Sequence, residues 1–88
     1  MYYLIKSHIK DPKKHMEAHK TIREHAKSNA KLKHYYISRD GKETFEIWET
    51  SSRDLIKSLM DKYLMKSATF EIIEIEERMF DQMNKRAA

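Results

Sequence analysis

Three histidines stand out among the residues that could do chemistry, because His15, His19 and His25 fall within one eleven-residue segment, HMEAHKTIREH. On a helix that turns about 100° per residue, they share a sector of roughly 120° with Ala18 and Ile22. An imidazole titrates at about pH 6.5, so it can exchange a proton with a ligand or bind a metal ion. Because this sector carries few charges, we expect it to face the interior.

Three interpretations of this histidine face are open. His15 and His19 are about 6 Å apart along a helix axis and could share one metal ion, whereas His25 is about 9 Å beyond His19. A third protein ligand would come from elsewhere, for example His8, His34 or a carboxylate such as Glu46. Since no spacing requires that ligand, we predict no metal site. The histidines are then either packed polar groups at a helix–sheet boundary or groups that face a ligand.

A predicted hairpin brings a second group of candidate residues together. Residues 32–38 (LKHYYIS) and 44–49 (TFEIWE) are rich in β-forming types, and Asp40-Gly41 is a tight-turn dipeptide between them. With a two-residue loop, Tyr36 pairs with Phe45 and His34 pairs with Ile47. We expect these four side chains to face the core. The opposite side would carry Tyr35, Ile37, Thr44, Glu46 and Trp48.

These assignments place a candidate site between a helix and the sheet. We predict His19, His34 and Tyr36 as catalytic residues, able to move a proton or orient a substrate oxygen. The predicted ligand pocket is lined by His15, Ile22, His25 and Phe45. Packing, with each hydroxyl satisfied at the rim of the core, is the alternative role for the tyrosines.

The elements that must position these residues follow from periodicity and caps. Tyr2–Ile9 alternates at period two, as a strand does. Asp11 and Pro12 suit the cap and first position of a helix that ends at about residue 27 or 28. After the hairpin, residues 51–54 resemble a capping box before a second helix. Residues 69–77 form a final strand, and residues 78–88 a polar tail or short helix.

The order strand, helix, strand, strand, helix, strand predicts an α+β fold of the ferredoxin-like βαββαβ plan. In this plan a four-stranded antiparallel sheet carries both helices on one face. A chain of 88 residues has room for one such domain, so we predict a single domain over residues 1–88. The uncovered sheet face would expose Tyr35, Ile37 and Trp48, and we expect it to pair with a second copy in a homodimer.

Composition narrows the class of protein. Hydrophobic residues make up 40% of the chain and charged residues 36%, which is typical of a folded domain and not of a linker. The absence of cysteine excludes disulfides and thiolate chemistry. No apolar run approaches the ~18 residues of a membrane span, and the N-terminal segment lacks the features of a signal peptide. We therefore expect a cytoplasmic protein with no membrane partner.

The uneven distribution of charge leaves nucleic acid as an alternative partner. The chain has a formal net charge of +4, and residues 1–42 hold 11 basic against 4 acidic residues. A basic half favours an anionic partner such as RNA or DNA. However, the segment GKETFEIW lacks the aromatic alternation of RNA-binding sheets, so we expect nucleic acid less than a hydrophobic small molecule. A non-enzymatic dimerisation module is a further alternative.

The segment TFEIWETSSRDLIKSLMDKYLMKSATFEIIEI, residues 44–75, resembles the dimeric α/β-barrel superfamily in its Trp-ended strand, helix and closing strand. This superfamily includes antibiotic-biosynthesis monooxygenases, haem-degrading monooxygenases and muconolactone isomerase. The resemblance implies a pocket between helices and sheet, and a cofactor-independent monooxygenase, isomerase or cyclase acting on a hydrophobic or aromatic compound. Haem-degrading members use an Asn, a Trp and a His where this chain has Ser7, Lys57 and Ser67. We therefore expect no haem and no other cofactor.

Overall fold

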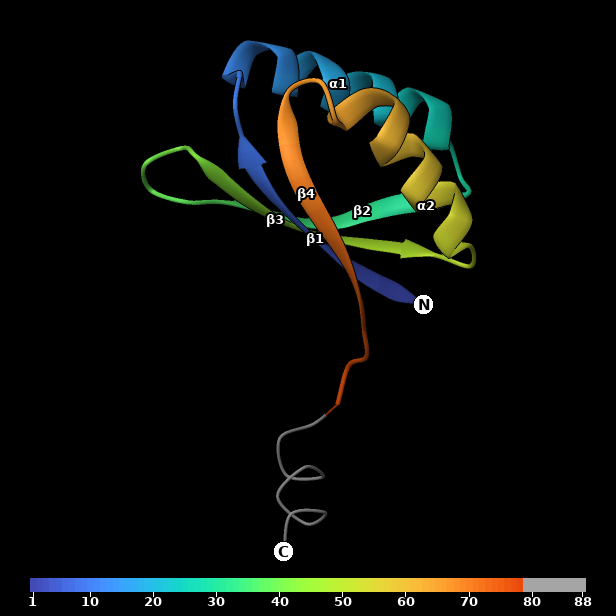
Figure 1. The fold of residues 1–88 in the computed structure, drawn as a ribbon. Coiled ribbons are helices and arrows are strands. Elements are labelled where there is room, and N and C mark those ends of the chain that lie inside the picture. The colour runs from blue at the N-terminus through green and yellow to red at the C-terminus, as the bar shows by residue number, and fades with distance from the viewer. Residues whose placement is uncertain (79–88) are drawn as a thin grey trace, which may run out of the picture.

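The computed structural model describes residues 1–78 and has the predicted α+β architecture (Figure 1). All strand pairs are antiparallel, and the sheet order is β2-β3-β1-β4. Both helices cover the same face of the sheet (Figure 1). The elements are β1 Tyr2–Ile9, α1 Pro12–Ala26, β2 Ala30–Ile37, β3 Glu43–Thr50, α2 Arg53–Leu59, η1 Met60–Leu64 and β4 Ala68–Ile75. The predicted ferredoxin-like fold is confirmed, whereas the tail predicted at residues 78–88 lies almost wholly outside the described residues.

Helix α1 begins and ends at the signals in the sequence. The Asp11 side chain accepts a hydrogen bond from the Lys14 backbone N–H at 3.1 Å, and Pro12 occupies the first turn. This arrangement satisfies one of the amide groups left free at a helix start, and proline has no amide to satisfy. The helix ends at Ala26 because Lys27 adopts a positive φ of 52°.

The second helical segment has a capped start and an irregular end. Ser52 accepts a hydrogen bond from the Leu55 backbone N–H at 3.1 Å, which is the interaction of an N-cap serine. The regular helix α2 then continues into η1, a five-residue π-helical turn. The segment buries one apolar stripe against the sheet, formed by Ile56, Leu59, Met60 and Leu64.

The hairpin between β2 and β3 has the predicted register. Tyr36 pairs with Phe45 and His34 pairs with Ile47. At the turn, Gly41 has a φ of 76°, and Asp40 accepts hydrogen bonds from the Ser38 hydroxyl and the Lys42 backbone N–H at 2.6 and 3.0 Å. These bonds hold the pKa of the Asp40 carboxyl below its usual value. The turn residues thus set the pairing that the sequence predicted.

The predicted orientation of β3 is wrong. Trp48 and Glu46 are fully buried under the helices, while Phe45 and Ile47 lie on the face without helices. The reason is the pairing with β1, which sets Trp48 opposite Tyr3 on the helix side of the sheet. The core therefore contains Tyr3, Ile5, Ile22, Trp48, Ile56, Met60 and Leu64.

Because the orientation of β3 is reversed, the residues predicted to lie on the open sheet face lie instead on the helix side. Trp48 is part of the core, and Tyr35 and Ile37 pair with Glu46 and Thr44 on the helix side. The outer face instead presents a row of apolar residues across three strands, formed by Ile47, Leu4 and Ile73.

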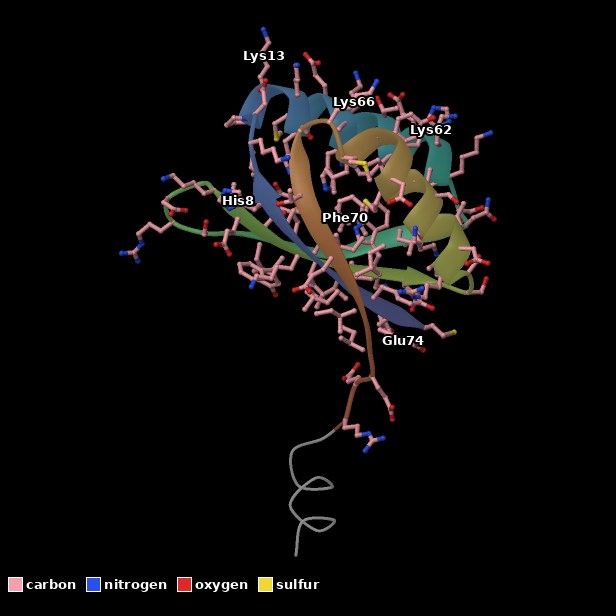
Figure 2. All side chains as sticks on the ribbon, viewed as in Figure 1. His8, Lys13, Lys62, Lys66, Phe70 and Glu74 are labelled. Carbon is pink, nitrogen blue, oxygen red and sulfur yellow. The ribbon has the colours of Figure 1, made fainter. Side chains whose placement is uncertain are left out.

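The helical layer is polar on its outer side. Lys13, Lys62 and Lys66 are exposed and project from the helical side of the molecule (Figure 2). Within residues 1–78, no helix is long and apolar enough to cross a membrane.

Candidate functional site

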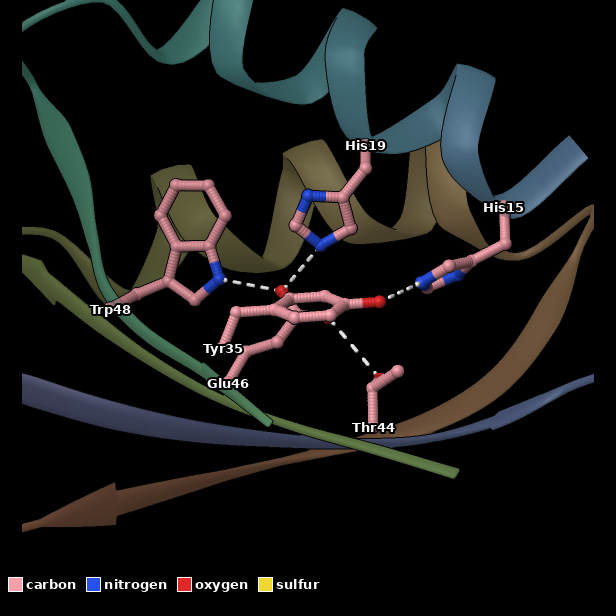
Figure 3. A network of polar contacts seen from close by, with 6 residues as sticks. All are labelled: His15, His19, Tyr35, Thr44, Glu46 and Trp48. Atoms are coloured by element: carbon pink, nitrogen blue, oxygen red, sulfur yellow. Dashed lines mark hydrogen bonds and ion pairs between the residues drawn. The ribbon is translucent and has the colours of Figure 1, made fainter. Parts of the chain in front are cut away.

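A buried polar cluster lies between α1 and the sheet. His15 and His19, one turn apart on α1, point down toward Glu46 on β3 (Figure 3). These three residues are only 1%, 5% and 0% exposed, respectively. Polar groups at such depth are costly unless they are hydrogen-bonded, so their partners decide what the cluster can do.

Glu46 receives hydrogen bonds from three donors. Its Oε1 atom accepts from His19 Nε2 at 2.7 Å and from the Trp48 indole N–H at 3.0 Å. Its Oε2 atom accepts from the Thr44 hydroxyl at 3.3 Å. Thr44, Glu46 and Trp48 alternate along one strand and therefore share a face, which fixes the position of the carboxylate.

Tyr35 closes the other side of the cluster from β2. Its hydroxyl and His15 Nε2 are hydrogen-bonded at 3.3 Å, and its ring meets the His19 ring edge to face at 5.2 Å. Burial, followed by the negative charge of Glu46, raises the pKa of Tyr35. Burial, followed by the proximity of His19, lowers the pKa of His15. At neutral pH these effects favour a neutral phenol and a neutral imidazole.

Two buried polar atoms at this cluster lack hydrogen-bond partners among residues 1–78. They are His15 Nδ1 and Ser7 Oγ. Ser7 pairs with Thr44 in the sheet, so it borders the same cluster. Buried polar atoms without partners are uncommon in folded proteins and often mark functional positions.

The charge of Glu46 is not compensated by a lysine or an arginine. Every Lys and Arg among residues 1–78 is exposed. An isolated buried carboxylate is strongly unfavourable, so it must pair with a cation, gain a proton or bind an ion. In the described part of the chain, the side chain that pairs with this carboxylate is His19, with its Nε2 atom 2.7 Å from Glu46 Oε1.

A small groove opens beside the cluster between α1 and β2. It has a volume of about 220 Å³ and is lined by Met16, His19, Arg23, Leu32 and Tyr35. Because His19 Nε2 is bonded to Glu46, Nδ1 is the ring nitrogen left to meet a ligand. The groove therefore reaches His19, whose partner Glu46 stays fully buried behind it.

Larger depressions lie elsewhere on the surface. One of about 410 Å³ follows β4 and α2 and includes Lys57, Phe70 and Ile72. Another of about 510 Å³ lies on the outer sheet face and includes His34, Ile47 and Ile75. Two more depressions, of about 370 and 460 Å³, reach Ser7 and Trp48 at the margin of the cluster. None of these four larger depressions is lined by His15, His19 or Glu46. We therefore base the candidate site on the smaller groove.

The structure brings together only part of the predicted site. His15, His19 and Ile22 lie together on the buried face of α1. His25 is exposed and stacks on Tyr63 of η1, with ring centroids 5.0 Å apart. It therefore does not border the groove that His19 lines.

The two predicted catalytic residues of the hairpin lie on the other side of the sheet from His19. His34 and Tyr36 stack on each other on the outer face, with centroids 6.0 Å apart, and Phe45 lies on the same face. This placement follows from the reversed orientation of β3. The prediction that His19, His34 and Tyr36 form one catalytic site is therefore wrong for a single chain.

Sequence reasoning missed the roles of Thr44, Glu46 and Trp48. Glu46 entered only as one conceivable metal ligand, and Trp48 as an interface residue. The available signal was the alternating pattern Thr-x-Glu-x-Trp, which puts one carboxylate between two hydrogen-bond donors on a single strand face. A helix face rich in histidine was the second signal, because it needs a polar counterpart in the sheet.

The cluster is suited to two kinds of chemistry. A histidine held by a buried carboxylate can donate a proton to a ligand or accept one from it. Two histidines and a carboxylate in contact can also hold a metal ion.

Comparisons with known proteins identify the fold but no family. No protein-family profile matches the sequence, and no curated protein matches it. Among solved structures, the de novo designed protein Foldit4 is similar with a TM-score of 0.58 and 17% identity, covering 88% of this chain and 97% of that chain. Protein Atu4242 from Agrobacterium tumefaciens aligns with a TM-score of 0.43 and 18% identity, covering 88% and 95%. At 17% identity, the likeness to Foldit4 shows the small α+β fold alone.

Proposed function

We propose that this protein binds a small aromatic or hydrophobic compound in the groove between α1 and β2. The observation that carries the proposal is the fully buried Glu46, hydrogen-bonded to His19 at 2.7 Å where His19 reaches the groove. A pocket with apolar walls and a few placed polar groups is the usual form of a small-molecule site. The fold and the resemblance of residues 44–75 support membership in the dimeric α/β-barrel superfamily.

The groove selects ligands by size and charge. Met16 and Leu32 supply apolar walls, while Arg23 supplies a permanent positive charge. The volume of about 220 Å³ is below the range of roughly 300–1,000 Å³ typical for drug-sized ligands. We therefore infer a ligand with one ring and an anionic oxygen, such as an aromatic carboxylate or a phenolate.

The chemistry that the groove supports best is proton transfer to or from the bound compound. Glu46 orients the imidazole of His19 through Nε2, which leaves Nδ1 to face the ligand. Tyr35 supplies the opposite wall of the groove, while its hydroxyl is hydrogen-bonded to His15. This arrangement favours an isomerase-like or cyclase-like reaction over oxygenation, because it supplies an oriented acid or base.

The proposed assembly is a homodimer formed through the outer sheet face. The row of Ile47, Leu4 and Ile73 crosses three strands, and Ile73 keeps 41% of its exposure. Lys6 on β1 and Glu71 on β4 lie opposite each other in the sheet, beside this row. In a two-fold dimer, Glu71 of one copy can therefore lie against Lys6 of the other copy. Two antiparallel sheets packed face to face would cover the apolar row.

Ligand binding is tested by titrating isotope-labelled protein with 4-hydroxybenzoate in the presence of a metal chelator. We expect amide shifts around Met16, His19 and Leu32, and a weaker affinity for Arg23→Gln by about tenfold or more, because a hydrogen bond to a charged group is lost. Arg53→Gln, which removes another exposed arginine, at the β4 depression, should bind as the wild type does. Shifts confined to the β4 depression or the outer face, or no shifts at all, would contradict the proposal.

A further inference from the structure

We infer that His15, His19 and Glu46 form a binding site for one divalent transition-metal ion, such as Zn²⁺. One imidazole nitrogen from each histidine and one carboxylate oxygen lie within 4.8 Å of one another. The spacing along the sequence did not require Glu46 as a third ligand, and the fold supplies it. This inference goes beyond the proposed function, because the ion would bind whether or not an organic ligand does.

The three side chains form a ligand set that suits such an ion. Two histidines and one carboxylate are the protein ligands of several zinc enzymes, and the same set on one side of an ion is used by non-haem iron sites. Three protein ligands leave at least one coordination position open. Tyr35, hydrogen-bonded to His15 and exposed to the groove, lies where a water or a ligand oxygen would approach.

The distances require only a small rearrangement. In a tetrahedral site with bonds of about 2.1 Å, neighbouring ligand atoms are about 3.4 Å apart. The contact of 2.7 Å between His19 Nε2 and Glu46 Oε1 must therefore open by roughly 0.7 Å. The other pairs of ligand atoms are at most 4.8 Å apart, so they must approach each other by no more than about 1.4 Å. Rotations of the side chains are sufficient for shifts of this size.

The surroundings of the cluster favour a cation. Among residues 1–78, no Lys or Arg forms a salt bridge with the buried carboxylate of Glu46. His15 Nδ1 is buried without a hydrogen-bond partner in the same part of the chain.

The carboxylate is also held by outer partners, as metal ligands usually are. The Trp48 indole N–H and the Thr44 hydroxyl both donate to Glu46 (Figure 3). Partners of this kind orient a ligand, and their loss typically lowers metal affinity by about 10- to 100-fold. The cluster thus has inner ligands and supporting groups.

The test is a titration of metal-free protein with Zn²⁺ by calorimetry and with Co²⁺ by visible absorption, without any organic ligand. We expect wild type to bind one ion per chain. His15→Gln should lose about a hundredfold or more in affinity, since loss of a direct ligand exceeds loss of an outer partner. Thr44→Val, which removes only one outer partner, should lose about tenfold.

Matched variants keep the result interpretable. His34→Gln removes an exposed histidine from the outer face and should bind as wild type does. Glu46→Gln serves as a second ligand variant if His15→Gln does not fold, and the fluorescence of Trp48 reports folding in each case. The inference would be overturned if the folded wild-type protein bound no ion. It would also be overturned if His15→Gln bound the ion as tightly as wild type, or if His34→Gln lost binding. Because ligand binding is measured with a chelator present, either proposal can fail alone.

Discussion

Glu46 illustrates how a small domain can retain a buried carboxylate. The side chain is fully buried and accepts hydrogen bonds from His19, Trp48 and Thr44. Hydrogen bonds to a charged group are stronger than those between neutral groups, and here they offset part of the cost of dehydration. The donors depend on Glu46 in turn, because each would otherwise be buried without that acceptor.

Removal of the Glu46 side chain should therefore be strongly destabilising. For Glu46→Ala we expect a loss of about 3–5 kcal/mol in the free energy of unfolding, because one partner of a buried pair disappears and the others remain. Urea denaturation followed by Trp48 fluorescence would measure the loss.

An exposed acid provides the control for this prediction. Glu24→Ala, at an exposed position of α1, should change the stability by no more than about 0.5 kcal/mol. Equal effects of the two substitutions would show that the buried cluster contributes little to stability.

Strand β3 carries plausible core residues on both of its faces. Phe45 and Ile47 alternate with Thr44, Glu46 and Trp48, so the pattern alone favours the purely apolar set as the buried one. Pairing with β1 decides otherwise, because Tyr3 and Ile5 lie opposite Trp48 and Glu46 under the helices. The polar face of β3 then meets the polar face of α1.

The orientation of β3 predicts how its two faces respond to truncation. Trp48→Ala should cost about 3–5 kcal/mol in stability, because the largest buried side chain is replaced by a cavity. Ile47→Ala, one position away on the outer face, should cost well under half as much. Chemical denaturation followed by far-UV circular dichroism would compare the two variants.

A spectroscopic observation checks the same orientation in the wild-type protein. Trp48 is the single tryptophan of the chain, so its emission reports one environment. A buried indole should emit at short wavelength and resist quenching by acrylamide. Rapid quenching in the folded protein, or equal losses for the two truncations, would contradict the buried position.

The two-layer architecture leaves one sheet face without helices, and this affects the state of association. The proposed homodimer would cover the row of Ile47, Leu4 and Ile73 on that face. Nucleic-acid binding through base stacking on Trp48 is excluded, because Trp48 is fully buried. The exposed lysines of the helical layer lie on the opposite side of the molecule from the apolar row.

The dimer is tested by introducing charge into the apolar row. Ile73→Arg should shift the protein from dimer to monomer, because it buries an unpaired charge at the interface. Ile37→Arg, at an exposed isoleucine on the helix side, should leave the dimer intact. Analytical ultracentrifugation would measure both. A wild-type monomer, or dissociation caused by Ile37→Arg instead, would contradict the proposed interface.

The order and type of the elements were predictable because their determinants are local. The caps at Asp11 and Ser52 and the turn at Asp40-Gly41 act within a few residues along the chain. The hairpin register followed from the same turn. These interactions operate in any tertiary context, so they can be read without knowing which strands are neighbours.

The composition of the buried face of α1 was predictable only in part. His15, His19 and Ile22 are buried as expected, but His25 lies roughly 90° around the helix from the centre of the buried stripe. That position reaches Tyr63 on the neighbouring helical segment. How α1 is rotated on the sheet depends on its packing partners, which periodicity does not identify.

The chemistry of the site was decided by contacts between segments far apart in the chain. His19 and Glu46 are separated by 27 positions, and their contact requires both the pairing of β3 with β1 and the packing of α1 on that sheet. Alternation specifies which side chains share a face but not which face is covered. For this reason the histidines were recognisable as candidates from their spacing, whereas their carboxylate partner emerged only when the two layers were assembled.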